Sequence, residues 1–158
     1  MKALFIFLLL CLSSSILFAQ SLLENEQYMN AYIIVVDTNQ DYFQLRDEMF
    51  ALREKFYIEI DTMGRTYDDA KNLICLPDDN EDDLYAGNYF VRRFPSKALS
   101  LEYLKYYESK LPTEDNTIAL VALITDKKQE AEEYLSSIIP LAKNSRIVEA
   151  KLYMGCMH

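Results

Sequence analysis

The sequence predicts an α+β domain in which two β-strand–helix–β-strand units share one sheet. A continuous apolar and β-branched run occurs twice, as AYIIVVD (residues 31–37) and TIALVALIT (residues 117–125), and turn residues bound each run. Such a run is typical of a strand that is buried on both faces. Behind each run the apolar residues first recur every three or four positions, as on one face of a helix, and then alternate, as along a strand.

The first unit covers residues 31–61. Its helix can begin at Thr38 or Asn39, because both are residue types that cap helices. The apolar residues at helical spacing are Tyr42, Leu45, Met49, Leu52 and Phe56. The segment YIEID (residues 57–61) then alternates and predicts the second strand, with Ile58 and Ile60 on one side.

The second unit covers residues 117–154. Its helix is expected to begin at an Asp126 cap, and Pro140 should end or kink it. The apolar face of this helix consists of Ala131, Tyr134, Leu135, Ile138, Leu141 and Ala142. The closing strand, RIVEAKLYM (residues 146–154), alternates and places on one face Val148, Ala150, Leu152 and Met154.

Two such units predict a ferredoxin-like βαββαβ sheet with the helices packed on one side, and a three-layer α/β sheet is the alternative. A central strand/loop/helix insertion, residues 62–116, separates the units and is too long for a plain connection. It holds a short strand (residues 71–77), an acidic run with five carboxylates (residues 78–83), an extended segment (residues 85–94) and a helix (residues 97–111). We expect the features that distinguish this protein from a bare scaffold to lie in this insertion.

A signal peptide precedes the domain. Lys2 is followed by an apolar run and by small and polar residues that close on Leu17, Phe18 and Ala19, which predicts cleavage after Ala19 and a single domain over residues 20–158. No later segment is long and apolar enough to span a bilayer. We therefore expect a bacterial protein of the periplasm or the secreted fraction. The net charge of −9 argues against a nucleic-acid partner, because phosphate binding needs clustered Lys and Arg.

The sequence offers few residues for catalysis or for a cofactor. The single histidine, His158, is the last residue, and the three glycines are isolated from one another. Histidine-based triads, zinc sites and Gly-rich phosphate loops therefore find no support, and we predict neither enzyme activity nor a cofactor. Cys75 and Cys156 remain after processing, and they either form a disulfide or stay as two buried thiols.

The acidic run raises a calcium hypothesis. Asp78, Asn80 and Asp82 match the first, third and fifth positions of an EF-hand loop. Asp83 stands where that loop requires Gly, however, and Tyr89 stands where it requires a bidentate Glu. We predict no metal site and interpret the run as a solvated connection, with a less regular calcium site as the alternative.

The tract behind the acidic run combines tyrosine with arginine, the residue types most enriched at binding hot spots. Aromatic rings also stack on sugars, and the guanidinium group binds carboxylates in a forked geometry. The residues that we predict to bind a ligand are Arg65, Tyr85, Tyr89, Arg92 and Arg93. The structural alternative places the aromatic residues in the core and pairs Arg92 or Arg93 with the neighbouring acids.

The two-unit plan in a small exported protein resembles the SPOR domain, the peptidoglycan-binding module of bacterial cell-envelope proteins. The resemblance covers residues 31–61 and 117–154, and YAGNYF adds Gly87 and Tyr89, which echo the family's Gly-x-aromatic pattern after a strand. Asp37 departs from the pattern near a position where that glycine would be expected. The resemblance implies noncatalytic binding of peptidoglycan glycan strands on the sheet face. The alternative is a protein–protein interaction subunit that docks another envelope or surface protein through the central Tyr/Arg/acidic segment.

Overall fold

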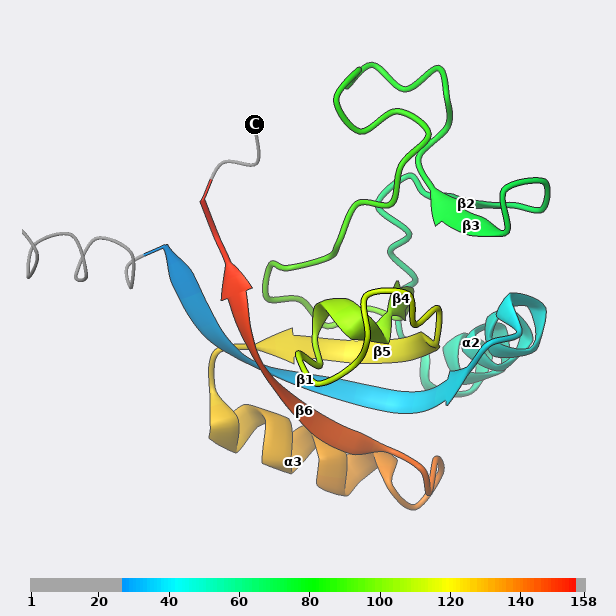
Figure 1. The fold of residues 1–158 in the computed structure, drawn as a ribbon. Coiled ribbons are helices and arrows are strands. Elements are labelled where there is room, and N and C mark those ends of the chain that lie inside the picture. Colours follow the sequence, from blue (N-terminus) through cyan, green and yellow to red (C-terminus); the bar gives the residue numbers. More distant parts are fainter. Residues whose placement is uncertain (1–26, 156–158) are drawn as a thin grey trace, which may run out of the picture.

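The computed structural model describes residues 27–155 and shows an α+β domain, which confirms the predicted class (Figure 1). The predicted signal peptide with its cleavage site, together with Cys156 and His158, lies outside these residues. The elements in chain order are β1 (Tyr28–Asn39), α2 (Tyr42–Phe56), β2 (Thr66–Asp68), β3 (Leu73–Cys75), β4 (Ser100–Tyr103), the 3-10 helix η1 (Leu104–Tyr106), β5 (Ile118–Thr125), α3 (Lys128–Ile138) and β6 (Arg146–Tyr153).

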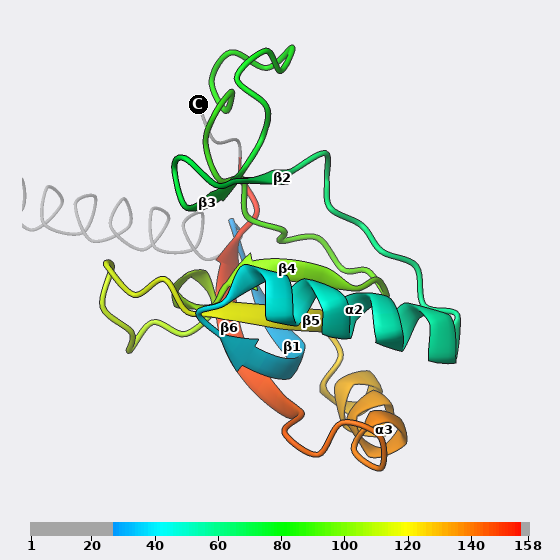
Figure 2. The same cartoon turned by 90° about the vertical axis from the view of Figure 1, so that its right-hand side faces the viewer.

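Four antiparallel strands form the main sheet in the order β4-β5-β1-β6. The two central strands are the two apolar runs of the sequence, and every residue of β5 is buried. In the middle of the sheet, Ile33 of β1 faces Ile124 of β5 on one side and Val148 of β6 on the other. Strands β2 and β3 form a separate hairpin, which stands away from the sheet together with the loop that follows it (Figures 1 and 2).

Both helices pack on one face of this sheet. The side chains of Leu45, Met49 and Leu52 in α2 share a buried cluster with those of Ala131 and Ile138 in α3. The sheet contributes alternate residues of its strands to that cluster, as the predicted alternation requires. Within the described residues, no helix is both long enough and apolar enough to cross a membrane.

The opposite face of the sheet is buried as well. Ala31, Ile33 and Val35 of β1 point to this side and are at most 1% exposed. They form a second apolar cluster with residues outside the sheet, which are Val91, Leu104, Tyr107 and Leu111. The sheet is therefore covered on both faces, by two helices on one side and by η1 and a stretch of irregular chain on the other.

The helix boundaries differ from the predicted ones at the N-terminal ends. Asp41, and not Thr38 or Asn39, caps α2, because its side chain accepts hydrogen bonds from the backbone N–H groups of Phe43 and Gln44. Helix α3 begins without a side-chain cap, so the predicted Asp126 cap is wrong. Its last residue, Ile138, lies two positions before Pro140, which agrees with the predicted end.

Two predicted elements are wrong in kind. Residues 57–61 form no strand and contribute only one parallel bridge, between Ile60 and Leu99. The predicted helix over residues 97–111 is instead β4 followed by η1. The physical reason is that Leu101 and Tyr103 face the helices while Glu102 faces the opposite side, which is a period of two.

Candidate functional site

Three of the five predicted binding residues, Arg65, Tyr89 and Arg92, converge on Glu102 of β4. The Arg65 guanidinium donates to both of its carboxylate oxygens, with Nη1–Oε2 and Nη2–Oε1 distances of 2.8 and 2.5 Å. Both side chains are at most 1% exposed. The Tyr89 hydroxyl donates to Oε2 at 2.5 Å, and the Arg92 backbone N–H approaches the same oxygen at 3.4 Å. This is a bidentate, charge-assisted pair that has been removed from water.

The electrostatics of this network follow from burial and from the carboxylate. Burial alone would lower the pKa of Arg65, but the hydrogen bonds and charge of Glu102 outweigh it and raise that pKa. Burial, and then the negative charge of Glu102, raise the pKa of Tyr89 and of Tyr107 well above 10. The network therefore holds one ion pair and two neutral phenols at neutral pH.

Arg92 fastens the chain just before β4. Its Nη1 donates to the Ala98 carbonyl and to the Ser100 hydroxyl, each at 2.8 Å, and its Nη2 donates to the Ser96 carbonyl at 3.0 Å. The Tyr107 hydroxyl donates to the Arg92 carbonyl at 2.6 Å. Burial lowers the pKa of Arg92, and Glu102 partly offsets this effect. We call residues 88–98 the covering segment, because these contacts hold it over the second face of the sheet.

Arg93 fastens the other end of the sheet. Its Nη1 donates to the backbone carbonyls of Tyr153 and Gly155, each at 2.9 Å, at the end of β6. Its guanidinium carbon lies 5.4 Å from the centre of the Phe94 ring, within the range of a cation–π contact. Among the described residues, the buried Nε of Arg93 has no hydrogen-bond partner.

The five predicted binding residues thus lie at three separate locations in the structure. Arg65, Tyr89 and Arg92 meet around Glu102, Arg93 lies at the end of β6, and Tyr85 packs edge-to-face on Phe90 with ring centroids 4.8 Å apart. The three guanidinium groups are buried and bonded to groups of the chain itself. The sequence does not single out Glu102, because a lone acid within a predicted helix is typical of an exposed position.

The acidic run forms a loop at the surface. Lys71 pairs with Asp78 at 2.5 Å, and the loop is closed by a hydrogen bond from the Gly87 N–H to the Pro77 carbonyl at 3.2 Å. Gly87 has a φ of 68°, a conformation that favours glycine. Within residues 27–155 no group of three or more His, Cys, Asp or Glu side chains is arranged to hold a metal ion. The nearby Cys75 is buried, and burial raises the pKa of its thiol.

An exposed stripe of α2 is the most distinctive surface of the described chain. Phe43 and Phe50 lie along it seven residues apart and are each 43% exposed, and Tyr57, which is 92% exposed, follows seven residues later at the C-cap of the helix. Arg46 and Arg53 alternate with them, so that the spacing is three, four, three and four. We call these five residues the α2 seam. The spacing of the seam is visible in the sequence. It was not predicted as a site because the inward apolar stripe alone is enough to predict the helix.

A groove of about 950 Å³ runs beside the seam, and we call it the α2 groove. One wall is α2 and the other is the irregular stretch 58–62. The residues that line it are Tyr42, Arg46, Met49, Phe50, Arg53, Glu54, Tyr57, Ile58, Glu59, Ile60 and Thr62. The Arg46 guanidinium pairs with Asp47 at 2.9 Å and lies 5.1 Å from the centre of the Phe43 ring. The groove thus combines apolar surface with two cations, Arg46 and Arg53, which lie about two helical turns apart.

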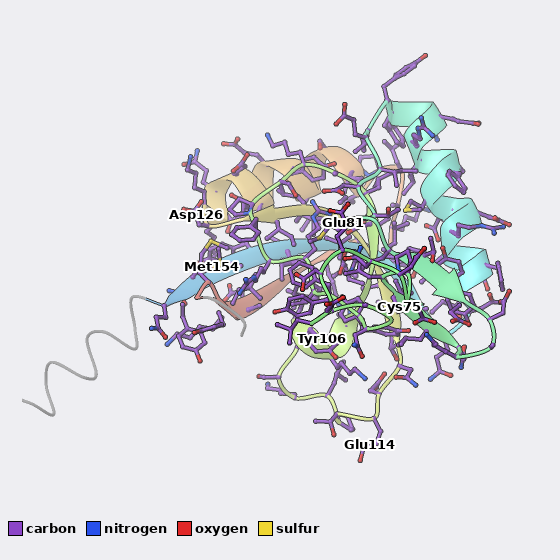
Figure 3. The ribbon with its side chains drawn as sticks, turned by 90° about the horizontal axis from the view of Figure 1, so that it is seen from above. Cys75, Glu81, Tyr106, Glu114, Asp126 and Met154 are labelled. Carbon is purple, nitrogen blue, oxygen red and sulfur yellow. The ribbon has the colours of Figure 1, made fainter. Side chains whose placement is uncertain are left out.

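A second groove, of about 630 Å³, lies around Tyr67 and is more polar. The Tyr67 ring stacks on that of Tyr42 with centroids 4.2 Å apart, and its hydroxyl bonds to the Asn72 side chain. The other residues that line this Tyr67 groove are Gln40, Tyr103, Pro112, Glu114, Asp115, Asn116 and Ile118. Figure 3 shows Glu114 at the tip of its loop, pointing away from the body of the molecule. Amide and carboxylate groups beside an aromatic ring suit a polyhydroxylated ligand.

The geometry of residues 27–155 therefore includes a buried polar network, which holds the covering segment in place, and the two open grooves beside α2 and around Tyr67. No protein-family model matches the chain, and neither a curated protein nor a solved structure is similar enough to be matched with it.

Proposed function

We propose that this protein is an exported, noncatalytic binding module that docks another envelope protein through the α2 groove. The observation that carries the proposal is the α2 seam, in which three exposed aromatic residues alternate with two arginines. Large exposed apolar side chains that gather on one surface typically mark an interaction site. Aromatic and arginine side chains are also the commonest anchors of protein interfaces.

The ferredoxin-like assignment and the relationship to SPOR domains belong to the same proposal. Two observations support them. The strand order is β4-β5-β1-β6, and one helix connects each pair of strands, with α2 between β1 and β4 and α3 between β5 and β6. The shared cluster of α2 and α3 on one face supports them too. In this assignment β4 takes the place that residues 57–61 were expected to fill.

The covered sheet favours a protein partner over glycan bound on the sheet face. A ligand on that face would have to reach Ile33, Val35 or Val121, and each of these is 0% exposed beneath the second apolar cluster. The arginines that were expected to contact such a ligand donate their hydrogen bonds to other groups of the chain instead. The tyrosines with the most strongly raised pKa values, Tyr89 and Tyr107, are buried beside Glu102, which supports a structural role for them.

The test compares two phenylalanines that are both exposed. Phe50 lies in the α2 seam and Phe94 lies in the covering segment, at 43% and 53% exposure. We expect residues 20–158 to retain a partner from cross-linked envelope extract, and Phe94→Ala to retain the same partner. Phe50→Ala should lose it, because truncating an interface anchor costs about 2 kcal/mol or more. Equal retention by the two variants would contradict the proposal.

Glycan binding is the second candidate, and the Tyr67 groove is the observation that favours it. Its tyrosine ring and its amide and carboxylate side chains suit a sugar better than they suit an apolar peptide. If the protein binds peptidoglycan, it should sediment with isolated murein sacculi, and Tyr67→Ala should abolish this while Phe50→Ala does not. Absence of the wild-type protein from the pellet would remove this candidate.

A further inference from the structure

We infer that the partner presents an amphipathic α-helix to the α2 groove, with acidic side chains over the two arginines of the seam and aliphatic side chains over its aromatic rings. This inference rests on the proposed function, because it specifies the ligand of the same groove. It follows from the spacing of the seam, from the second wall of the groove and from the distribution of charge.

The spacing of the seam is that of a coiled-coil contact line. The aromatic residues at positions 43, 50 and 57 and the arginines at positions 46 and 53 repeat every seven residues. Within α2, a rise of about 1.5 Å per residue separates Phe43 from Phe50, and Arg46 from Arg53, by about 10 Å. Tyr57 continues the spacing in the sequence and lies at the C-cap of the helix. A second helix packed along such a line meets one seam residue every half heptad. An extended strand repeats every two residues and cannot keep this register.

The second wall makes the seam a groove instead of an open helix face. Ile58 and Ile60 line it and are half-buried. The wall is held in place by backbone hydrogen bonds from the Asp61 N–H to the Leu99 carbonyl at 3.0 Å and from the Leu99 N–H to the Glu59 carbonyl at 2.7 Å. The groove is therefore formed before a partner arrives, which lowers the ordering cost of docking a helix with an apolar face.

The charges specify which side chains the helix carries. Within the described residues Arg53 is exposed and makes no ion pair, whereas Arg46 pairs only with its exposed neighbour Asp47. A carboxylate that faces either guanidinium gains a charge-assisted hydrogen bond. Glu54 and Glu59 line the same groove and repel acidic side chains placed away from the arginines. The partner's acids are thereby confined to two positions about 10 Å apart.

Two labelled synthetic peptides test this inference. Each is a helix-forming sequence of about four turns, with leucines in register with the aromatic residues; the acidic peptide has glutamates in register with Arg46 and Arg53, and the basic peptide has lysines there. We expect residues 20–158 to bind the acidic peptide and, by fluorescence anisotropy, to bind the basic peptide at least about tenfold more weakly.

Charge reversal provides the decisive comparison. Arg46→Glu/Arg53→Glu should bind the basic peptide and lose the acidic one, with thermal melting used to show that the variant is folded. Arg53→Glu alone should weaken acidic-peptide binding about tenfold, whereas Lys55→Glu, which makes the same change two residues away and outside the seam, should not.

Several results would overturn the inference. Equal affinity of the wild type for both peptides, or an unchanged preference in the double variant, would exclude acidic recognition in this register. If either of these peptide results occurs while Phe50→Ala still loses the envelope partner, the proposed function survives and only this inference fails. If the wild type self-associates and Phe50→Ala makes it monomeric, the groove belongs to a second copy of the chain, and the inference fails as well.

Discussion

The pairing of Glu102 with Arg65 indicates a structural role for the neighbouring arginines, Arg92 and Arg93. The two residues are 37 positions apart in the chain, and the bond between them brings the chain after α2 onto β4. Arg92 and Arg93 then fasten the covering segment to the start of β4 and to the end of β6. Side chains that looked like a binding surface act as internal ties, because each guanidinium supplies several donors in a fixed geometry.

Glu102→Gln is expected to lower the free energy of unfolding by about 3–5 kcal/mol, because it leaves the Arg65 charge buried without its counter-charge. Urea unfolding followed by circular dichroism measures this loss. The matched control is Asp47→Asn, which removes the partner of Arg46 in an exposed pair and should cost less than about 1 kcal/mol. Similar losses in the two variants would mean that the Arg65–Glu102 pair does not hold the fold.

Tyr107 predicts how stability depends on alkaline pH. Its pKa is raised in the folded state, first by burial and then by Glu102, so the unfolded chain releases the phenolic proton first. The contribution of Tyr107 is therefore fully present below about pH 10 and is lost as pH rises further, by about 1.4 kcal/mol per pH unit.

The Tyr107→Phe variant should accordingly show a shallower fall of stability above about pH 10 than the wild type. Tyr57→Phe, which alters an exposed tyrosine, is the control and should keep the wild-type slope. Unfolding free energies at a series of pH values between about 9 and 11 provide the measurement. An unchanged slope in Tyr107→Phe would show that this phenol does not keep its proton in the fold.

At the scale of the elements, α2 has two stripes with different roles. Leu45, Met49 and Leu52 point inward and join the core, whereas the α2 seam is exposed and, apart from Phe43, lines the α2 groove. Residues 57–61, which follow this helix, are not a strand because Tyr57 ends α2 in the left-handed conformation with a φ of 57°. The stretch then serves as the second wall of the groove.

The two helix starts offer a direct comparison of capping. Asp41→Ala removes the acceptor for the N–H groups of Phe43 and Gln44, and it should destabilise the protein by about 1 kcal/mol. Asp126→Ala, at the uncapped start of α3, should change stability by no more than about 0.5 kcal/mol. Chemical denaturation of both variants measures the difference, and equal losses would exclude Asp41 as the cap.

The elements that the sequence predicts well are those with a simple period. Both central strands, both helices and β6 agree with the apolar pattern, because each buries one stripe or both faces against the same sheet. Strand β4 was predicted as a helix because Leu101, Leu104 and Leu111 happen to fall at helical spacing. Its burial depends on Glu102 meeting Arg65, a distant contact that no local pattern records.

At the scale of the whole molecule, the sheet lies between two unlike layers. Helices α2 and α3 cover one face, and η1 with the covering segment covers the other. The predicted insertion thus contains the fourth strand of the main sheet and part of the core, as well as the acidic loop. This is why the proposed site could not be located from the insertion: its three arginines are buried, whereas the exposed residues that alternate aromatic and arginine side chains belong to the α2 seam.

The net charge of −9 predicts a stabilising effect of salt. Most ion pairs of the described chain are exposed and individually weak, so screening them costs little. Screening the repulsion among the excess carboxylates should dominate, and the melting temperature should rise as NaCl increases to about 0.15 M. Sucrose at matched osmolality serves as the uncharged control, and a fall of the melting temperature with NaCl would contradict the prediction.

The hydrogen bonds at Leu99 also bear on how this protein avoids aggregation. Strand β4 is an edge of the sheet, and an open edge invites pairing with other chains. Residues 59–61 bond to Leu99 at the start of this edge, and the Tyr89 hydroxyl accepts from the outward N–H of Tyr103 at its end, at 3.3 Å. Because one contact is a single bridge and the other is a side chain, neither provides a template for a further strand. This edge of the sheet is thus closed by the chain's own residues, which leaves few free backbone groups there for a strand of another molecule.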